Sequence, residues 1–192
     1  CAANCTVTDI RVYAGLINQG ISNLKYYTGS EYYINPTYVA NKWFAYDLAL
    51  IRLNTNILLD GASGLTGINA ICLPEENVTN VAEEYALLNG FGHNTDDGWG
   101  KGVQRVGWTK IMKGNPNNSH GESVKLFFKR TPYPTGTAGC TYVNGVAVLI
   151  GIYRGTNTGN ACMGLAPKSK GYACRVSYHM QWIVNTIYDN NP

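Results

Sequence analysis

The side chains that could carry out acid–base or nucleophilic chemistry in this chain are few and far apart in the sequence. Asp47 precedes an apolar run, and the only imidazoles belong to His93, His120 and His179. A hydroxyl or thiol nucleophile needs a base within hydrogen-bond reach, and a carboxylate commonly orients that base. The histidines stand in loop-like or helical contexts, so we expect them to be solvated or hydrogen-bonded rather than to act as such a base.

The six cysteines favour disulfides over a metal site. No two of them are spaced as CxxC, and none has histidines clustered nearby. Zinc and thiol redox motifs need such spacing, whereas disulfides persist in oxidising compartments. We therefore expect a secreted protein without a metal or a cofactor. The residues alone do not give the connectivity, because six cysteines allow many pairings.

The elements that must position these groups are mainly β-strands. The 192 residues include 22 glycines and 14 tyrosines, and only 14% are charged, which suits a strand-and-turn protein. Val103 to Met112 and Tyr142 to Tyr153 are rich in aliphatic, β-branched or aromatic residues, so each predicts a strand. Ser177 to Tyr188 has helical spacing, with Ser177 as the expected N-cap. No apolar run of about 18 residues occurs, so the sequence predicts no membrane span.

Short motifs along essentially the whole chain match one known pattern. They are Ala2-Ala3-Asn4-Cys5, Asn35-Pro36-Thr37-Tyr38, Asp47 to Leu53, Ile71-Cys72-Leu73-Pro74, Asn89-Gly90-Phe91-Gly92, Asn144 to Ile152, and Arg175-Val176-Ser177 with Gln181-Trp182-Ile183. In this order they resemble the chymotrypsin/trypsin family of serine proteases. The segment after Asp47, for example, is close to that family's Asp-Ile-Ala-Leu-Ile-x-Leu.

The resemblance implies an all-β fold, a trypsin-like double antiparallel β-barrel with a C-terminal helix. Residues 1–75 would be the remainder of the first barrel, and residues 76–192 the second barrel with the helix. The chain begins where the family has already built several first-barrel strands, and a closed barrel needs every strand. We therefore expect that the N-terminal strands are missing from this sequence; the alternative is that a separate segment supplies them.

The resemblance also places the family's catalytic triad, and two of its three positions are changed. Asp47 matches the orienting carboxylate, whereas Asn4 stands where the family has its histidine. An amide cannot accept a proton near neutral pH, so Asn4 cannot act as a general base. The nucleophile position falls on Ala138 or on Thr137, depending on how the loop is aligned, and residues 124–168 contain no serine. We expect Asp47 to have a structural role.

A remnant of the family's substrate pocket is implied at four positions, Tyr153, Arg154, Gly155 and Gly171. The glycines would leave room for a substrate side chain, but Arg154 places a cation where the family has an aromatic wall. We therefore expect a blocked or remodelled cleft. By the same resemblance, Cys140 and Cys162 form the disulfide that braces the pocket, and Cys72 pairs with a cysteine outside this sequence.

Sequons predict glycosylation sites, and the distribution of charge indicates the kind of partner. Asn77 and Asn117 begin sequons in polar loops and are candidate glycosylation sites. Residues 1–96 contain 4 Lys/Arg and 9 Asp/Glu, whereas residues 97–192 contain 11 and 3. This polarity favours an acidic glycan or an acidic protein face as partner of the second half, with solvated surface lysines as the alternative. No nucleic-acid recognition motif accompanies the charge, so we expect no nucleic-acid partner.

The residues and the resemblance together predict a secreted, catalytically inactive serine protease homologue. It would act as a binding or regulatory protein, with a protease, an inhibitor or another cascade component of an immune or haemostatic pathway as its partner. One alternative is an active endopeptidase relative with a rearranged site, using Thr137 or a cysteine with His179. The other is a structural or storage glycoprotein.

Overall fold

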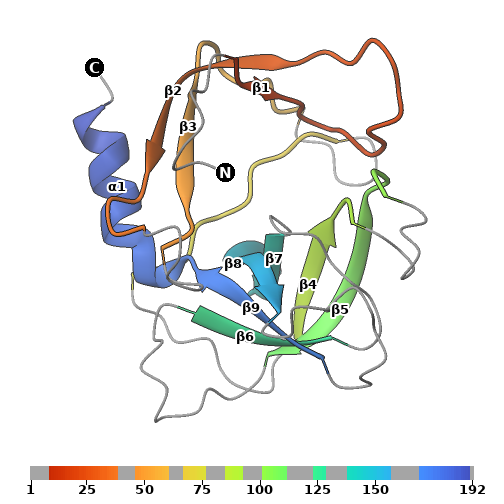
Figure 1. The fold of residues 1–192 in the computed structure, drawn as a ribbon, viewed down its shortest axis with the longest axis vertical. Helices are drawn as coiled ribbons and strands as arrows, with labels where there is room; N and C mark the ends of the chain where they lie inside the picture. The colour runs from red at the N-terminus through yellow and green to blue at the C-terminus, as the bar shows by residue number, and fades with distance from the viewer. Residues whose placement is uncertain are drawn as a thin grey trace.

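The chain folds into two groups of antiparallel strands and one C-terminal helix (Figure 1). The computed structural model describes residues 9–38, 46–60, 67–76, 85–92, 101–111, 123–128, 138–156 and 169–190. In these residues the first group is a three-stranded sheet and the second is a closed six-stranded barrel. The helix runs beside the sheet and starts next to the barrel (Figure 1). The prediction of an all-β fold with a C-terminal helix is confirmed.

The three-stranded sheet comes from the first part of the chain. Its order is β1 (Arg11–Val12), β2 (Tyr27–Ile34) and β3 (Ala49–Leu53). A register shift between Gly29 and Glu31 marks a bulge in β2. A Cβ on Gly29 would lie 2.9 Å from the Cβ of Ile10, so this close crossing requires glycine.

The barrel closes because β4 pairs with both β5 and β7. Its strands are β4 (Tyr85–Gly90), β5 (Arg105–Ile111), β6 (Ser123–Phe128), β7 (Ala138–Val143), β8 (Val146–Thr156) and β9 (Ser169–Arg175). Around the ring they follow the order β4-β5-β6-β9-β8-β7, which leaves no unpaired strand edge. Alternate apolar side chains fill the interior, among them Ala86, Leu88, Ile111, Ile150, Tyr153 and Ala173.

The prediction of one strand from Tyr142 to Tyr153 is wrong, because this segment is a hairpin. Val143 of β7 pairs with Val146 of β8 across Asn144 and Gly145. These two residues have φ values of 50° and 79°, the left-handed conformation that two-residue hairpin turns of the primed types require. The predicted strand from Val103 to Met112 is observed as β5, preceded by an isolated bridge at Val103.

The C-terminal helix has two parts, a 3-10 turn η1 (Ser177–His179) and α1 (Met180–Asp189). Ser177 is not the N-cap that the sequence predicted. The N-cap positions are Val176 and His179, neither makes a side-chain cap hydrogen bond, and Ser177 is fully buried. The helix is held instead by packing, because Met180 and Ile183 join Leu48 and Val176 in one apolar cluster. Burying each such side chain contributes roughly 1.5–3 kcal/mol.

Within the described ranges, three groups of contacts tie the sheet half to the barrel half. Near Asn18, the amide of Gln19 donates to the carbonyl of Gly102 at 2.7 Å. Cys72 forms a parallel bridge with Val148, where β8 extends beyond its pairing with β9. The third contact joins the entrance of β3 to η1, and it surrounds Asp47.

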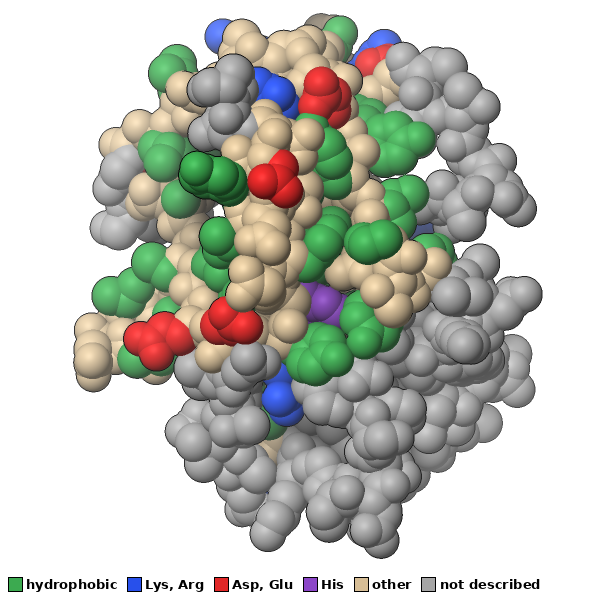
Figure 2. Space-filling model, turned by 90° about the vertical axis from the view of Figure 1, so that its left-hand side faces the viewer, with side chains coloured by type: hydrophobic (Ala, Val, Ile, Leu, Met, Phe, Trp, Pro, Cys, Tyr) green, Lys and Arg blue, Asp and Glu red, His purple; other side chains and the backbone are tan. Residues whose placement is uncertain are grey.

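Figure 2 shows the side of the molecule that carries α1. Apolar side chains are scattered over this side in small groups, with charged side chains between them. Among the residues that the structure describes, no helix is long and apolar enough to cross a membrane.

Candidate functional site

Of the predicted triad positions, Asp47 is the one whose side chain the structure describes. Asp47 is half-buried and lies two residues before β3. Ala138 is the first residue of β7, where its backbone pairs with Asn89 and Ile152. Asn4 and Thr137 lie outside the described residues. The convergence of these positions on one site therefore stays a prediction.

Asp47 is the central residue of a tight turn. The amide of Leu48 donates to the carbonyl of Tyr46 at 2.8 Å, which closes a three-residue turn around Asp47. Tyr46 has a φ of 67°, in the left-handed region that bulky side chains rarely occupy. Such a conformation costs on the order of 1–3 kcal/mol and persists only where neighbouring groups enforce it.

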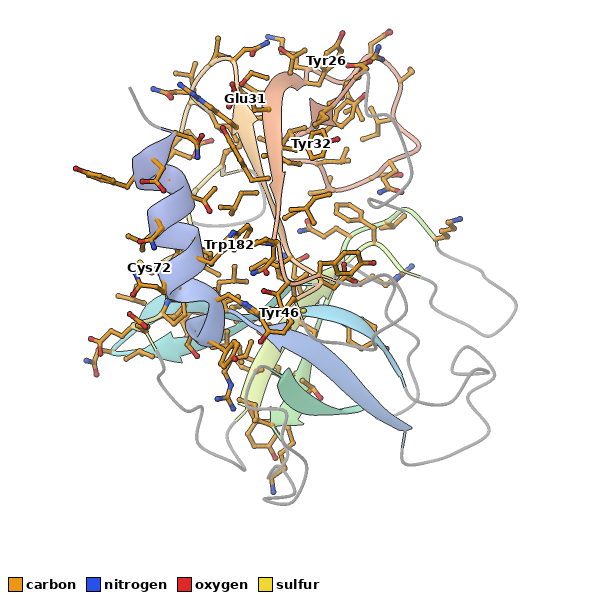
Figure 3. All side chains as sticks on the ribbon, turned by 60° about the vertical axis from the view of Figure 1, so that its left-hand side comes forward. Tyr26, Glu31, Tyr32, Tyr46, Cys72 and Trp182 are labelled. Atoms are coloured by element: carbon orange, nitrogen blue, oxygen red, sulfur yellow. The ribbon has the colours of Figure 1, made fainter. Side chains whose placement is uncertain are left out.

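Aromatic side chains of η1 enforce the conformation of Tyr46. The hydroxyl groups of Tyr46 and Tyr178 are 3.2 Å apart, and their ring centroids are 6.1 Å apart. The ring of Tyr46 also meets His179 edge-on, with centroids at 5.2 Å. Edge-to-face pairs contribute about 0.5–1.5 kcal/mol each beyond their buried area, enough to offset the backbone strain. Figure 3 shows Tyr46 between the sheet and the barrel, close to the start of α1.

The backbone of Asp47 is held from β9. The thiol of Cys174 lies 3.5 Å from the carbonyl oxygen of Asp47 and donates to it. Cys174 is only 1% exposed, and His179 only 3%. The Asp47 turn is thus fixed by two segments close together in the chain, the end of β9 and η1. Sequence reasoning missed Tyr46, Tyr178 and Cys174, because no local pattern shows which residues meet across the two halves.

The remnant pocket positions lie on two neighbouring barrel strands. Tyr153, Arg154 and Gly155 are consecutive in β8, and Gly171 of β9 pairs with Thr156. The register shifts between Tyr153 and Gly155, so Arg154 is the extra residue of a bulge. Tyr153 itself packs in the barrel core. The blocked or remodelled cleft stays a prediction, because the side chain of Arg154 is not among those that the structure describes.

Comparison with known proteins identifies the family of this chain. The model of the family described as Trypsin matches residues 1–183, which include all nine described strands and η1. The chain belongs to the trypsin family. No curated protein matches it.

In this trypsin-family chain the three described cysteines lie in different environments. Cys72 is exposed, Cys140 is half-buried and Cys174 is buried. The thiol of Cys140 donates to the carbonyl of Leu87 at 3.6 Å, and burial raises its pKa above the usual value. The predicted partner Cys162 lies outside the described residues, as do Asn77 and Asn117. The disulfide and both glycosylation sites therefore stay predictions.

The trypsin-family domain has no cluster of three or more His, Cys, Asp or Glu side chains that could hold a metal ion, within the ranges that the structure describes. The candidate site is centred on Asp47. Its turn is held on both sides, because Tyr46 contacts η1 and Leu48 packs against Val176.

Proposed function

We propose that this trypsin-family protein is catalytically inactive and acts as a secreted binding or regulatory protein. The observation that carries the proposal is the sequence at the two positions where the resemblance places the histidine and the serine. Asn4 stands in the Ala-Ala-His-Cys context of the family, and residues 124–168 contain no serine. Loss of the serine or the histidine of such a triad alone lowers the rate on the order of 10⁶-fold in a well-studied protease.

The buried imidazole supports inactivity over a rearranged active site. A substitute site needs a histidine within hydrogen-bond reach of a nucleophile that a substrate can approach. His179 is buried at the start of the helix and packs edge-on against Tyr46 and Tyr178. This position suits a structural imidazole.

Two of the described thiols, those of Cys140 and Cys174, are also poor nucleophiles in this setting. Cys174 is buried and its thiol donates to the carbonyl of Asp47. Burial raises the pKa of Cys140, so the reactive thiolate is scarce near neutral pH. A cysteine nucleophile is therefore disfavoured at both positions.

A retained scaffold without its chemistry is suited to protein binding. The turn that carries Asp47 is kept under backbone strain, and the barrel is closed and packed. We propose a protease, an inhibitor or another component of a proteolytic cascade, in an immune or haemostatic pathway, as the partner. The excess of Lys and Arg after residue 96 favours an acidic face on that partner, or an acidic glycan.

Activity-directed labelling tests inactivity. The chain is incubated with a fluorophosphonate probe and with generic peptide esters, beside trypsin as the positive control. We expect no label and no ester turnover above the buffer rate. An Asp47→Asn variant is the matched control, because it removes the only charge of the predicted triad. Turnover by the parent chain that this variant loses would overturn the proposal of inactivity.

Salt-dependent retention tests the choice of partner. The chain is applied to an immobilised sulfated polysaccharide and, separately, to an uncharged matrix. Electrostatic binding predicts retention on the first only, with elution as salt rises and screens the charges. Equal passage through both matrices would exclude the acidic glycan and leave a protein face as the partner.

A further inference from the structure

We propose that the Asp47 turn and the start of the C-terminal helix open and close together as one latch. The latch consists of Tyr46, Asp47, Cys174, Tyr178 and His179, which lie where the sheet half meets the barrel half. The position of Asp47 thus depends on the segment that begins at Cys174, which lies 127 positions later in the chain. This inference does not depend on whether the chain is an enzyme.

Two different kinds of contact join the same two segments. The thiol of Cys174 donates to the backbone carbonyl of Asp47 at 3.5 Å. The side chain of the preceding residue, Tyr46, meets Tyr178 through a hydroxyl contact of 3.2 Å and meets His179 ring to ring. Tyr46 and Asp47 are adjacent, and both are held by residues 174–179. Breaking one of the two contacts therefore strains the other.

The ring contacts within η1 complete the latch. Tyr178 and His179 lie edge to face, with centroids 5.1 Å apart and planes at 83°. Tyr46 therefore packs against a preformed aromatic pair, not against a single ring. Movement of η1 therefore displaces both ring partners of Tyr46 at once.

Backbone strain makes the latch switch between two states. Tyr46 holds its left-handed φ of 67° only while its surroundings enforce it. Once η1 moves away, Tyr46 relaxes toward the favoured region. The bond from the amide of Leu48 to the carbonyl of Tyr46 then breaks, because it needs the turn geometry.

The apolar cluster below the turn extends the coupling into the helix. Leu48 packs with Val176, Met180 and Ile183, so the residue after Asp47 shares a core with α1. Opening of the turn withdraws Leu48 from that core. Segments linked in this way open as one cooperative unit rather than residue by residue.

The latch has a consequence for any molecule that binds beside Asp47. A ligand that favours the closed turn also favours the docked helix, because the two share one equilibrium. The helix start is thus a position distant in sequence from which binding at Asp47 can be weakened or strengthened.

Hydrogen exchange of the intact chain tests the latch. Two amides report on it, that of Leu48, bonded to Tyr46, and that of His179, bonded to Val176 at 2.9 Å. In a Tyr178→Ala variant we expect both amides to exchange faster by the same factor, about tenfold, because one opening event exposes them. The matched control is Tyr188→Ala, a tyrosine of α1 that is 82% exposed, which should leave both rates unchanged.

Faster exchange at His179 with an unchanged rate at Leu48 would overturn the latch, since the two segments would then move independently. If Tyr178→Ala does not fold, Tyr178→Phe keeps the ring and removes only the hydroxyl contact. Loss of one hydrogen bond predicts about threefold faster exchange at both amides. A Leu48 rate equal to that of the parent chain in Tyr178→Phe would likewise overturn the proposal.

Discussion

The hydroxyl groups of Tyr46 and Tyr178 lie 3.2 Å apart, although 132 positions separate the two tyrosines in the chain. This contact connects the residue before Asp47 to the first turn of the C-terminal helix. It explains how a tyrosine remains in a conformation that usually belongs to glycine. The geometry of the candidate site is therefore set by the end of the chain.

Replacement of Tyr46 separates backbone strain from side-chain packing. Tyr46→Ala removes the ring contacts but keeps the unfavourable left-handed conformation, whereas Tyr46→Gly removes both. We expect both variants to be less stable than the parent chain, with the glycine variant about 1 kcal/mol more stable than the alanine variant. Urea unfolding measures the difference. A less stable glycine variant would contradict the strained conformation.

Thiol alkylation of the reduced protein should follow burial. Iodoacetamide modification, mapped by peptide mass spectrometry, is expected to be fastest at Cys72, slower at Cys140 and slowest at Cys174. Burial raises the pKa of Cys140, so its rate should climb as alkaline pH produces the thiolate. In urea the three rates should converge. Native modification of Cys174 at the rate of Cys72 would show that the latch is open.

Tyr33 should ionise at higher pH than an ordinary tyrosine. Its hydroxyl donates to the carboxylate of Glu31, and this hydrogen bond, followed by desolvation and the charge of Glu31, raises its pKa. A folded-state pKa above the unfolded value means that the stabilisation is complete below about pH 10 and is lost as the pH rises through the folded pKa. Carbon NMR of the phenol ring follows the titration.

The matched variants for this titration are Glu31→Gln and Glu75→Gln. Removing the charge of Glu31 should lower the pKa of Tyr33 towards the ordinary value, whereas the exposed Glu75 near Cys72 should have no effect. An unchanged titration in Glu31→Gln would show that the pair does not exist in solution.

The barrel core should be sensitive to cavity formation. Leu88 on β4 is 0% exposed, and Leu88→Ala is expected to destabilise the fold by about 3–5 kcal/mol. Leu58→Ala removes the same atoms from a side chain that is 80% exposed and should cost less than about 0.5 kcal/mol. Chemical unfolding of both variants gives the comparison. Equal losses of stability in Leu88→Ala and Leu58→Ala would show that Leu88 is not part of the core.

Local sequence patterns predicted the β class and the helix but not every boundary. The composition of the segment from Tyr142 to Tyr153 predicts one strand, although Asn144-Gly145 is a strong signal for a hairpin turn. Ser177 has a side chain suited to capping, yet it is buried because the chain enters the helix through a 3-10 turn. In both segments, tertiary packing and turn geometry decided the outcome.

The candidate site was only partly predictable. Asp47 could be found because its flanking residues follow a family pattern, whereas the predicted replacement at Asn4 rests on the sequence alone. The roles of Tyr46, Tyr178 and Cys174 could not be found in the same way. They depend on contacts between residues far apart in the chain, which neither composition nor periodicity encodes.

Strand pairing in the barrel dictates when a newly synthesised molecule can finish folding. β6 must wait for β9, and the turn at Asp47 must wait for η1. Contacts of such high sequence separation form slowly, and unpaired strands are exposed to aggregation in the meantime. On the ribosome, the first half of the chain therefore emerges long before its partners exist. A truncation that removed η1 and α1 would therefore leave Tyr46 and Leu48 without their packing partners, more than 120 positions earlier in the chain.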